Sequence, residues 1–178
     1  MDRINIKPTD LNMNPHNMWL KQWFLLTAGD FQKDDYNTMT VAWGSIGTMW
    51  NKPFVQVVVR PTRFTFKFME KYNSFTLCAF APKYKSTLNF LGTKSGRDED
   101  KIRESGLTPI KSQKINAPSF AEAELIIECE KMYWDDLNPE QFLCSEIDNN
   151  YPLHDYHRIY FGEILHIAGT DKYFSRKA

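Results

Sequence analysis

The sequence predicts a mainly β protein, an antiparallel barrel with short flanking helices. About five or six segments show strand patterns, either alternating apolar and polar residues or runs of β-branched residues. The helical segments between them are too short to be regular crossovers between parallel strands. Aromatic residues make up 15% of the chain, which suits a β-rich core. We therefore expect a single domain over residues 1–178.

The N-terminal third is expected to supply three strands. Residues 1–18 are polar and interrupted by prolines, which predicts an extended lead-in. The apolar stretch 19–26 predicts the first strand, which ends at turn-forming residues. Residues 38–45 alternate and residues 54–59 are β-branched, so each segment predicts a strand. A Gly and a Pro in the link over 46–53 are expected to reverse the chain.

The rest of the chain is expected to alternate short helices with strands. Helices are predicted over 63–71, 85–91 and 138–142, and a further charged helix is predicted to end at Gly106. Strands are predicted over 74–80, 121–129 and 158–167. The first residues of 121–129 are also compatible with a helix, but the apolar run that follows them favours a strand.

Composition argues against several classes of protein. Lys and Arg total 22 and Asp and Glu total 22, so the chain lacks the basic excess that nucleic-acid binding requires. No apolar run has the length of a membrane span, and no signal-peptide pattern occurs. Cys78, Cys129 and Cys144 form no CxxC motif. We expect a reduced, cytoplasmic protein in which each cysteine is a buried small side chain.

Residues 36–65 predict a ligand site with two ends. Thr38, Thr40 and Ala42 share one face of a predicted strand, and this small, hydroxyl-bearing face suits a flat ring. Thr62 occupies the expected N-cap of the next helix, where Arg63 and Thr65 add donors for a phosphate. An ordinary β-hairpin followed by a Thr-capped helix explains the same pattern and stays open.

A second polar segment, 94–101, is a candidate cradle for an anionic ligand. Its Gly frees backbone amides, its Ser offers a hydroxyl, and two Lys and one Arg supply positive charge. A charged helix start is the plainer interpretation. His154 and His157 lie three residues apart, but no further ligand has a suitable spacing, so no metal site is expected. His157 is expected at a pocket rim as a proton donor or cofactor contact.

Four blocks of sequence occur in an order that resembles a known family. They are Asn37–Gly44 with Lys52-Pro53, Val59–Thr65, Ser95-Gly96-Arg97-Asp98 with Asp100-Lys101, and Asp155-Tyr156-His157 with Phe161–Ile164. Together they resemble the flavin reductase-like family, specifically its flavoredoxin-type members, over about residues 19–168. The resemblance implies an FMN-binding split barrel of Greek-key type, usually a homodimer with the flavin near the subunit interface.

The resemblance also implies roles for individual residues. His157 would lie where a hydride donor approaches, and Tyr156 replaces the family's usual small residue, so it is expected to narrow the pocket. The implied flavin contacts are Asn37, Thr38, Met39, Thr40, Ala42 and Trp43 at the ring, Arg60, Arg63 and Thr65 at the phosphate, and Ser95, Gly96 and Lys101 elsewhere on the flavin.

The expected function is therefore that of an FMN-binding oxidoreductase that takes electrons from NADH or NADPH as a transient donor. A flavoredoxin-like carrier that holds FMN permanently and exchanges electrons with a redox partner protein is the alternative. A protein that only stores flavin or haem also stays open.

Overall fold

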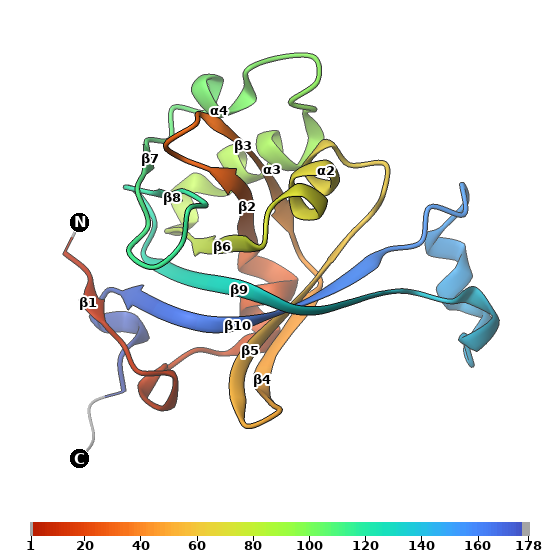
Figure 1. Cartoon of the computed structure of the whole chain (residues 1–178), viewed down its shortest axis with the longest axis horizontal. Coiled ribbons are helices and arrows are strands. Elements are labelled where there is room, and N and C mark those ends of the chain that lie inside the picture. Colours follow the sequence, from red (N-terminus) through yellow and green to blue (C-terminus); the bar gives the residue numbers. More distant parts are fainter. Residues whose placement is uncertain (1, 176–178) are drawn as a thin grey trace.

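The computed structural model describes residues 2–175, and Figure 1 shows a twisted main sheet with the three longest helices gathered at the top of the view. The strands are β1 (Ile4–Asn5), β2 (Phe24–Asp30), β3 (Asp35–Val41), β4 (Gly44–Met49), β5 (Lys52–Val59), β6 (Ser74–Ala79), β7 (Pro109–Ile110), β8 (Ser119–Phe120), β9 (Leu125–Asp136) and β10 (Arg158–Gly169). The helices are α1 (Pro15–Asn17), α2 (Phe64–Lys71), α3 (Lys85–Thr93) and α4 (Lys101–Glu104).

Short helical turns also occur in residues 2–175: η1 (Pro8–Asp10), the π-helical turn η2 (Met18–Gln22), η3 (Pro82–Tyr84), η4 (Pro139–Gln141), η5 (Ser145–Asn150) and η6 (Asp171–Tyr173). The predicted class, mainly β with few short helices, is confirmed. Met1 and residues 176–178, which belong to the predicted domain, lie outside the described residues.

The main sheet runs in the order β3-β2-β6-β9-β10-β5-β4, and β1 adds to β10. Every pairing in this sheet is antiparallel. Within this order β3 pairs only with β2, so one edge of β3 keeps backbone N–H and C=O groups that no neighbouring strand takes. This free edge borders the candidate site.

Side chains of successive residues enter two different apolar clusters. Leu26, Leu77 and Ile127 lie in the larger cluster, which fills the barrel. Their chain neighbours Leu25, Cys78 and Ile126 lie in the second cluster, together with Leu88 and Leu91 of α3. This division follows from the period of two in a β-strand, and it places α3 against the outer face of β3, beside Leu25 of β2.

The structure corrects three expectations about the first 53 residues. The lead-in is not simply extended, since β1 pairs with the end of β10 and short helical turns follow. The strand predicted over 19–26 begins only at Phe24, because the preceding residues form η2. The link predicted over 46–53 is mostly strand, and the chain reverses at Trp50 and Asn51, whose φ angles are +52° and +59°.

Two further expectations also change. The strand predicted over 121–129 begins at Leu125 and extends to Asp136, because β10 pairs with it along its whole length. Cys78 and Cys129 are buried as expected, but Cys144 is exposed. None of the helices in residues 2–175 is long and apolar enough to span a membrane.

Candidate functional site

Two adjoining cavities lie beside the free edge of β3. The first has a volume of about 190 Å³ and is lined by Met39–Trp43, Val58, Arg60, Arg63 and His157. The second has a volume of about 90 Å³ and is lined by Met39, Thr62–Thr65, Gly92–Ser95, Arg97 and Lys101. Met39 and Arg63 line both, so the two cavities form one site with an open end and a smaller, polar end.

The structure brings most of the predicted contacts to these two cavities. Met39, Thr40, Ala42, Trp43, Arg60 and His157 line the larger one, and Met39, Arg63, Thr65, Ser95 and Lys101 line the smaller one. Asn37 and Gly96 line a neighbouring groove instead, and Thr38 lines neither cavity.

The Thr-bearing face of β3 is not the open surface that the sequence predicts. The Thr38 hydroxyl is fully buried and bonds to the Thr27 hydroxyl and the Leu26 carbonyl, at 2.9 and 2.8 Å. The Thr40 hydroxyl donates to the Leu88 carbonyl of α3, at 2.5 Å. Because α3 packs against this face and Leu88 takes the Thr40 hydroxyl, the row of hydroxyls is not free to bind a ligand, and the larger cavity is bordered by the β3 edge and Met39.

The expected Thr62 cap is also corrected. Helix α2 begins at Phe64, its N-cap residue is Arg63, and no side chain caps it. The Thr62 hydroxyl donates to Asp155 Oδ2 at 3.0 Å instead. The first-turn N–H groups of α2 are therefore left without a side-chain acceptor beside the smaller cavity, which favours an anion there.

Lys101 places a buried positive charge at the smaller cavity. Its side chain is 3% exposed, and Nζ donates to the carbonyls of Leu91 and Lys94, both at 2.9 Å. Burial first, and then the charge of Arg63, lower the pKa of Lys101 to about 8. No carboxylate in residues 2–175 forms an ion pair with this ammonium. Glu99, two residues earlier in the chain, pairs with Lys94 instead. A buried cation without a counter-ion, next to an arginine, favours the binding of an anion.

The two predicted phosphate arginines are held very differently. Arg60 donates to Asp155 Oδ1 at 2.8 Å and to the Asn150 carbonyl at 2.7 Å, and its guanidinium lies 4.9 Å from the centre of the Tyr151 ring. Arg63 makes one hydrogen bond of 3.2 Å, to the Gly92 carbonyl. Arg63 therefore keeps more donors for a ligand, whereas Arg60 is mostly committed to the protein.

His157 closes the larger cavity as a neutral imidazole. It is 9% exposed, its Nδ1 lies 2.8 Å from the Tyr151 hydroxyl, and its ring centre lies 5.2 Å from that of Trp43. Burial, followed by the charge of Arg60, lowers the pKa of His157 to about 4. The imidazole is thus uncharged at neutral pH, so it can donate a hydrogen bond but is not a cationic acid.

Tyr156 does not narrow this cavity as expected. Its hydroxyl donates to Asp148 Oδ1 at 2.8 Å, and its ring packs 4.9 Å from that of Tyr151, outside both cavities. Tyr156 therefore belongs to an aromatic cluster in the link between β9 and β10.

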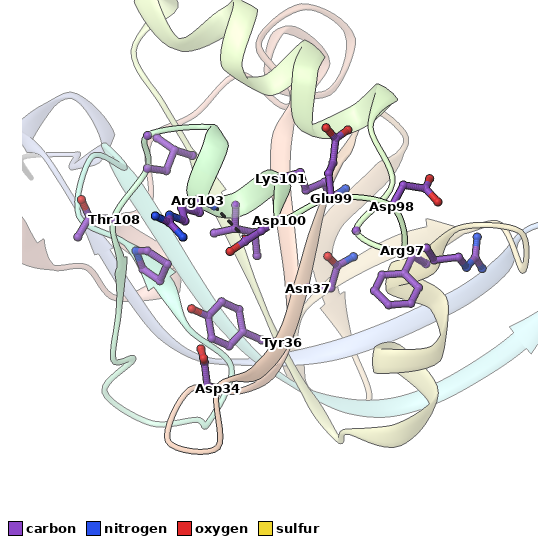
Figure 2. A pocket seen from close by; sticks show the side chains of 16 residues that line it. Asp34, Tyr36, Asn37, Arg97, Asp98, Glu99, Asp100, Lys101, Arg103 and Thr108 are labelled. Carbon is purple, nitrogen blue, oxygen red and sulfur yellow. Dashed lines mark hydrogen bonds between the residues drawn. The ribbon is translucent and has the colours of Figure 1, made fainter.

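A larger open groove, of about 820 Å³, is lined by residues 96–103 together with Tyr36 and Asn37 of β3 (Figure 2). In Figure 2 Asn37 lies beneath the 95–101 loop, between Tyr36 and Arg97. A Cβ at Gly96 would lie 2.5 Å from Asn37 Oδ1, so only glycine allows the loop to approach this closely. Asn37 Nδ2 in turn donates to the Thr65 hydroxyl at 2.7 Å, which links the loop to α2 beside the smaller cavity.

Comparison with known proteins identifies the family. The family model described as "Flavin reductase like domain" matches residues 21–175. The chain belongs to the flavin reductase-like family. This confirms the resemblance of the four sequence blocks, and the split-barrel class is confirmed by the similar solved structures.

The flavin reductase-like chain is similar to several proteins. An uncharacterized protein of Pyrococcus abyssi is 34% identical over 108 residues, which are 60% of this chain and only 59% of that relative. The flavoredoxin of Desulfovibrio vulgaris (Miyazaki F) is 21% identical, with a TM-score of 0.65 over 90% of this chain and 73% of that one. An FMN-binding protein from Thermus thermophilus, crystallised with p-hydroxybenzaldehyde, is 17% identical, with a TM-score of 0.67 over 88% and 75%.

Sequence reasoning missed two residues of this flavin reductase-like site. Tyr151 contacts both His157 and Arg60, and Asp155 bonds to both Arg60 and Thr62. Neither has a signal in local periodicity, because both lie in an irregular link that folds back on β5. Asp155 does stand inside one of the family-like blocks, which was the available signal.

Proposed function

We propose that this protein binds FMN at the free edge of β3 and passes electrons from NADH or NADPH through it to an acceptor. One observation carries the proposal: an open cavity lined by a strand edge joins a small cavity that holds a buried cation without a counter-ion. A flat ring with an anionic tail has the chemistry that these two cavities require together.

The residues present fit this cofactor. Arg63, Lys101 and the start of α2 would hold the phosphate, because they are the donors that the protein itself leaves without an anionic partner. Met39, Trp43 and the strand edge would hold the ring. When bound, FMN supplies the hydride and electron chemistry.

The chain's own groups would orient the ring and protect it. A neutral His157 that accepts the Tyr151 hydroxyl proton at Nδ1 carries its own proton on Nε2, which it can donate to a polar ring edge. Asp155 and Tyr151 position Arg60, so the positive charge of this arginine stays near His157 and adds to the effect of burial in keeping the imidazole neutral. Trp43, which is 48% exposed, lines the same cavity beside His157.

The deciding experiment is a spectroscopic titration. The purified protein is titrated with FMN, and the bound flavin is then mixed with NADH or NADPH without oxygen. Saturable binding followed by rapid bleaching of the flavin band is the expected result. A protein that binds no FMN would remove the basis of the proposal.

A second candidate is an electron carrier that holds FMN permanently and serves a redox partner protein. The structural similarity to the Desulfovibrio vulgaris flavoredoxin favours this candidate. Tight FMN binding with an unchanged spectrum in both nicotinamides, followed by reoxidation of photoreduced flavin by a protein acceptor, would select the carrier over the reductase.

A further inference from the structure

An open groove lies between η2, the chain that follows β6, and the first turns of α3. It has a volume of about 500 Å³, which is within the range of small-molecule sites. It shares no lining residue with either of the two cavities beside β3, so it is a separate site. Lysines line it and no carboxylate does. We call this surface the basic groove.

The floor of the basic groove is apolar. Phe80, Ala81 and Pro82, which follow β6, line it together with Leu88 of α3. Phe80 and Leu88 are buried, whereas Ala81 is half-buried and Pro82 is exposed. A ligand with an apolar body would therefore remove hydrocarbon surface from water here, which favours its binding.

Lys85 holds an ammonium group at this groove in a fixed position. Its Nζ donates to the Lys21 carbonyl and lies over the ring of Trp23. Burial lowers the pKa of Lys85, because the ammonium is partly withdrawn from water. No carboxylate in residues 2–175 forms an ion pair with Lys85 or with Lys21. These two unpaired positive charges favour a ligand that carries a negative charge.

A buried hydroxyl beside the groove also lacks a partner. Lys172 pairs with Glu124 at 3.0 Å, so this third lysine adds no unpaired charge. The next residue, Tyr173, is 2% exposed, and its hydroxyl makes no hydrogen bond of normal geometry within residues 2–175. Burial raises the pKa of Tyr173, and Lys172 and Gln22 lower it, so these two groove residues lie close to the hydroxyl. The basic groove therefore borders an unsatisfied donor as well as unpaired cations.

We propose that the basic groove binds a small organic carboxylate with an apolar body, such as a medium-chain fatty acid. The carboxylate meets the charges of Lys21 and Lys85, and the hydrocarbon covers Ala81 and Pro82. A neutral amphiphile lacks the first interaction, and a small anion lacks the second. The proposal does not depend on flavin binding.

Octanoate is the probe for the direct test. It is titrated into nitrogen-15-labelled protein while the amide resonances are followed, and saturable shifts are expected at residues 17–22 and 80–88. Octan-1-ol has the same tail without the charge, and acetate has the charge without the tail, so each should bind about tenfold or more weakly. No saturable octanoate binding, equal binding of octan-1-ol, or shifts centred on residues 62–65 and 92–101 would overturn the proposal.

Charge removal tests the two lysines. Lys85→Gln and Lys21→Gln should each weaken octanoate binding by about tenfold, because a hydrogen bond to a charged group is lost. Binding of octan-1-ol should stay unchanged in both variants, whereas a collapse of the groove would weaken it as well. Lys111→Gln, an equal charge change at an exposed position outside the groove, is the control. Octanoate affinities equal to wild type in both groove variants would contradict the assigned charge contacts.

Ala81→Asp keeps the test decisive if a lysine variant fails to fold. Ala81 is the N-cap residue of η3 and has extended backbone, a position that suits Asp. The added carboxylate would lie in the groove lining, so octanoate should bind about tenfold or more weakly and octyltrimethylammonium more tightly. Ala81→Asn, of the same size without the charge, is the control. Unchanged octanoate affinity in Ala81→Asp would show that the carboxylate binds elsewhere.

Added FMN separates this proposal from the proposed function. Octanoate should bind equally well with and without FMN, because the groove and the two cavities beside β3 have no residue in common. Displacement of octanoate by FMN would place it in those cavities and overturn the proposal. A protein that binds octanoate in the groove but no FMN would contradict the proposed function alone.

Discussion

The Nδ1 atom of His157 lies 2.8 Å from the hydroxyl of Tyr151, six residues earlier in the chain. This contact joins the link between β9 and β10 to the wall of the larger cavity. It holds a buried imidazole in one orientation beside Trp43, where burial, followed by the charge of Arg60, disfavours its protonation. The protonation of His157 is therefore the clearest electrostatic consequence of the fold.

Stability should fall as the pH drops from about 6.5 to about 4, in part because of His157. Burial and Arg60 lower its folded pKa to about 4, whereas the unfolded chain titrates near 6.5. The unfolded chain then binds a proton that the folded protein excludes, which costs about 2 kcal/mol at pH 5 relative to pH 7. Urea unfolding of wild type and His157→Asn at both pH values isolates this effect. An equal loss of stability in both proteins would show that His157 titrates normally.

Arg63→Ala should weaken FMN binding and leave the fold intact. A charged hydrogen bond to phosphate is worth about 1.5–3 kcal/mol, or about 10- to 150-fold in Kd. The side chain makes a single long bond within the protein, so thermal unfolding should change little. Fluorescence titration measures the affinity. Arg103→Ala, an equal charge change outside both cavities, is the control, and unchanged FMN affinity in Arg63→Ala would mean that the phosphate binds elsewhere.

FMN affinity should decrease as the pH rises above about 8. The free protein begins to lose the Lys101 proton there, and an anion binds the ammonium form more tightly than the amine. The expected slope is up to about tenfold in Kd per pH unit. Riboflavin, which has the same ring without the phosphate, should not show this slope. Parallel slopes for the two flavins would exclude Lys101 as a phosphate contact.

Gly96→Ala should weaken FMN binding by roughly 1 kcal/mol, or several-fold. The new methyl group would lie 2.5 Å from Asn37 Oδ1, so either the loop or Asn37 must move away from Thr65. Gly106→Ala is an instructive comparison, because its φ of +71° strains alanine while nothing lies within 4 Å of the new methyl group. Isothermal titration calorimetry should find weaker FMN binding in Gly96→Ala alone.

The sequence by itself determined the class of fold and most members of the candidate site. Alternation and β-branched runs mark the strands, because strand side chains repeat every two residues and each face has its own environment. The ordered blocks around Asn37, Arg63, Ser95 and His157 pointed to residues that the structure gathers at β3 and its neighbours. Local patterns were informative wherever a residue's neighbours in the chain also set its surroundings.

Only the tertiary structure decided which of those residues have free polar groups. Thr38 and Thr40 looked available from their spacing, but Thr27 and α3 take their hydroxyls. Arg60 and Arg63 looked alike, but Asp155, in the link between β9 and β10, binds Arg60, whereas Arg63 makes a single long hydrogen bond. The ammonium group of Lys101 is held in its buried position by two carbonyls, one in α3 and one just after it, and not by a carboxylate. Long-range packing creates these differences, because a hydrogen-bond partner is set by proximity in space and not by separation along the chain.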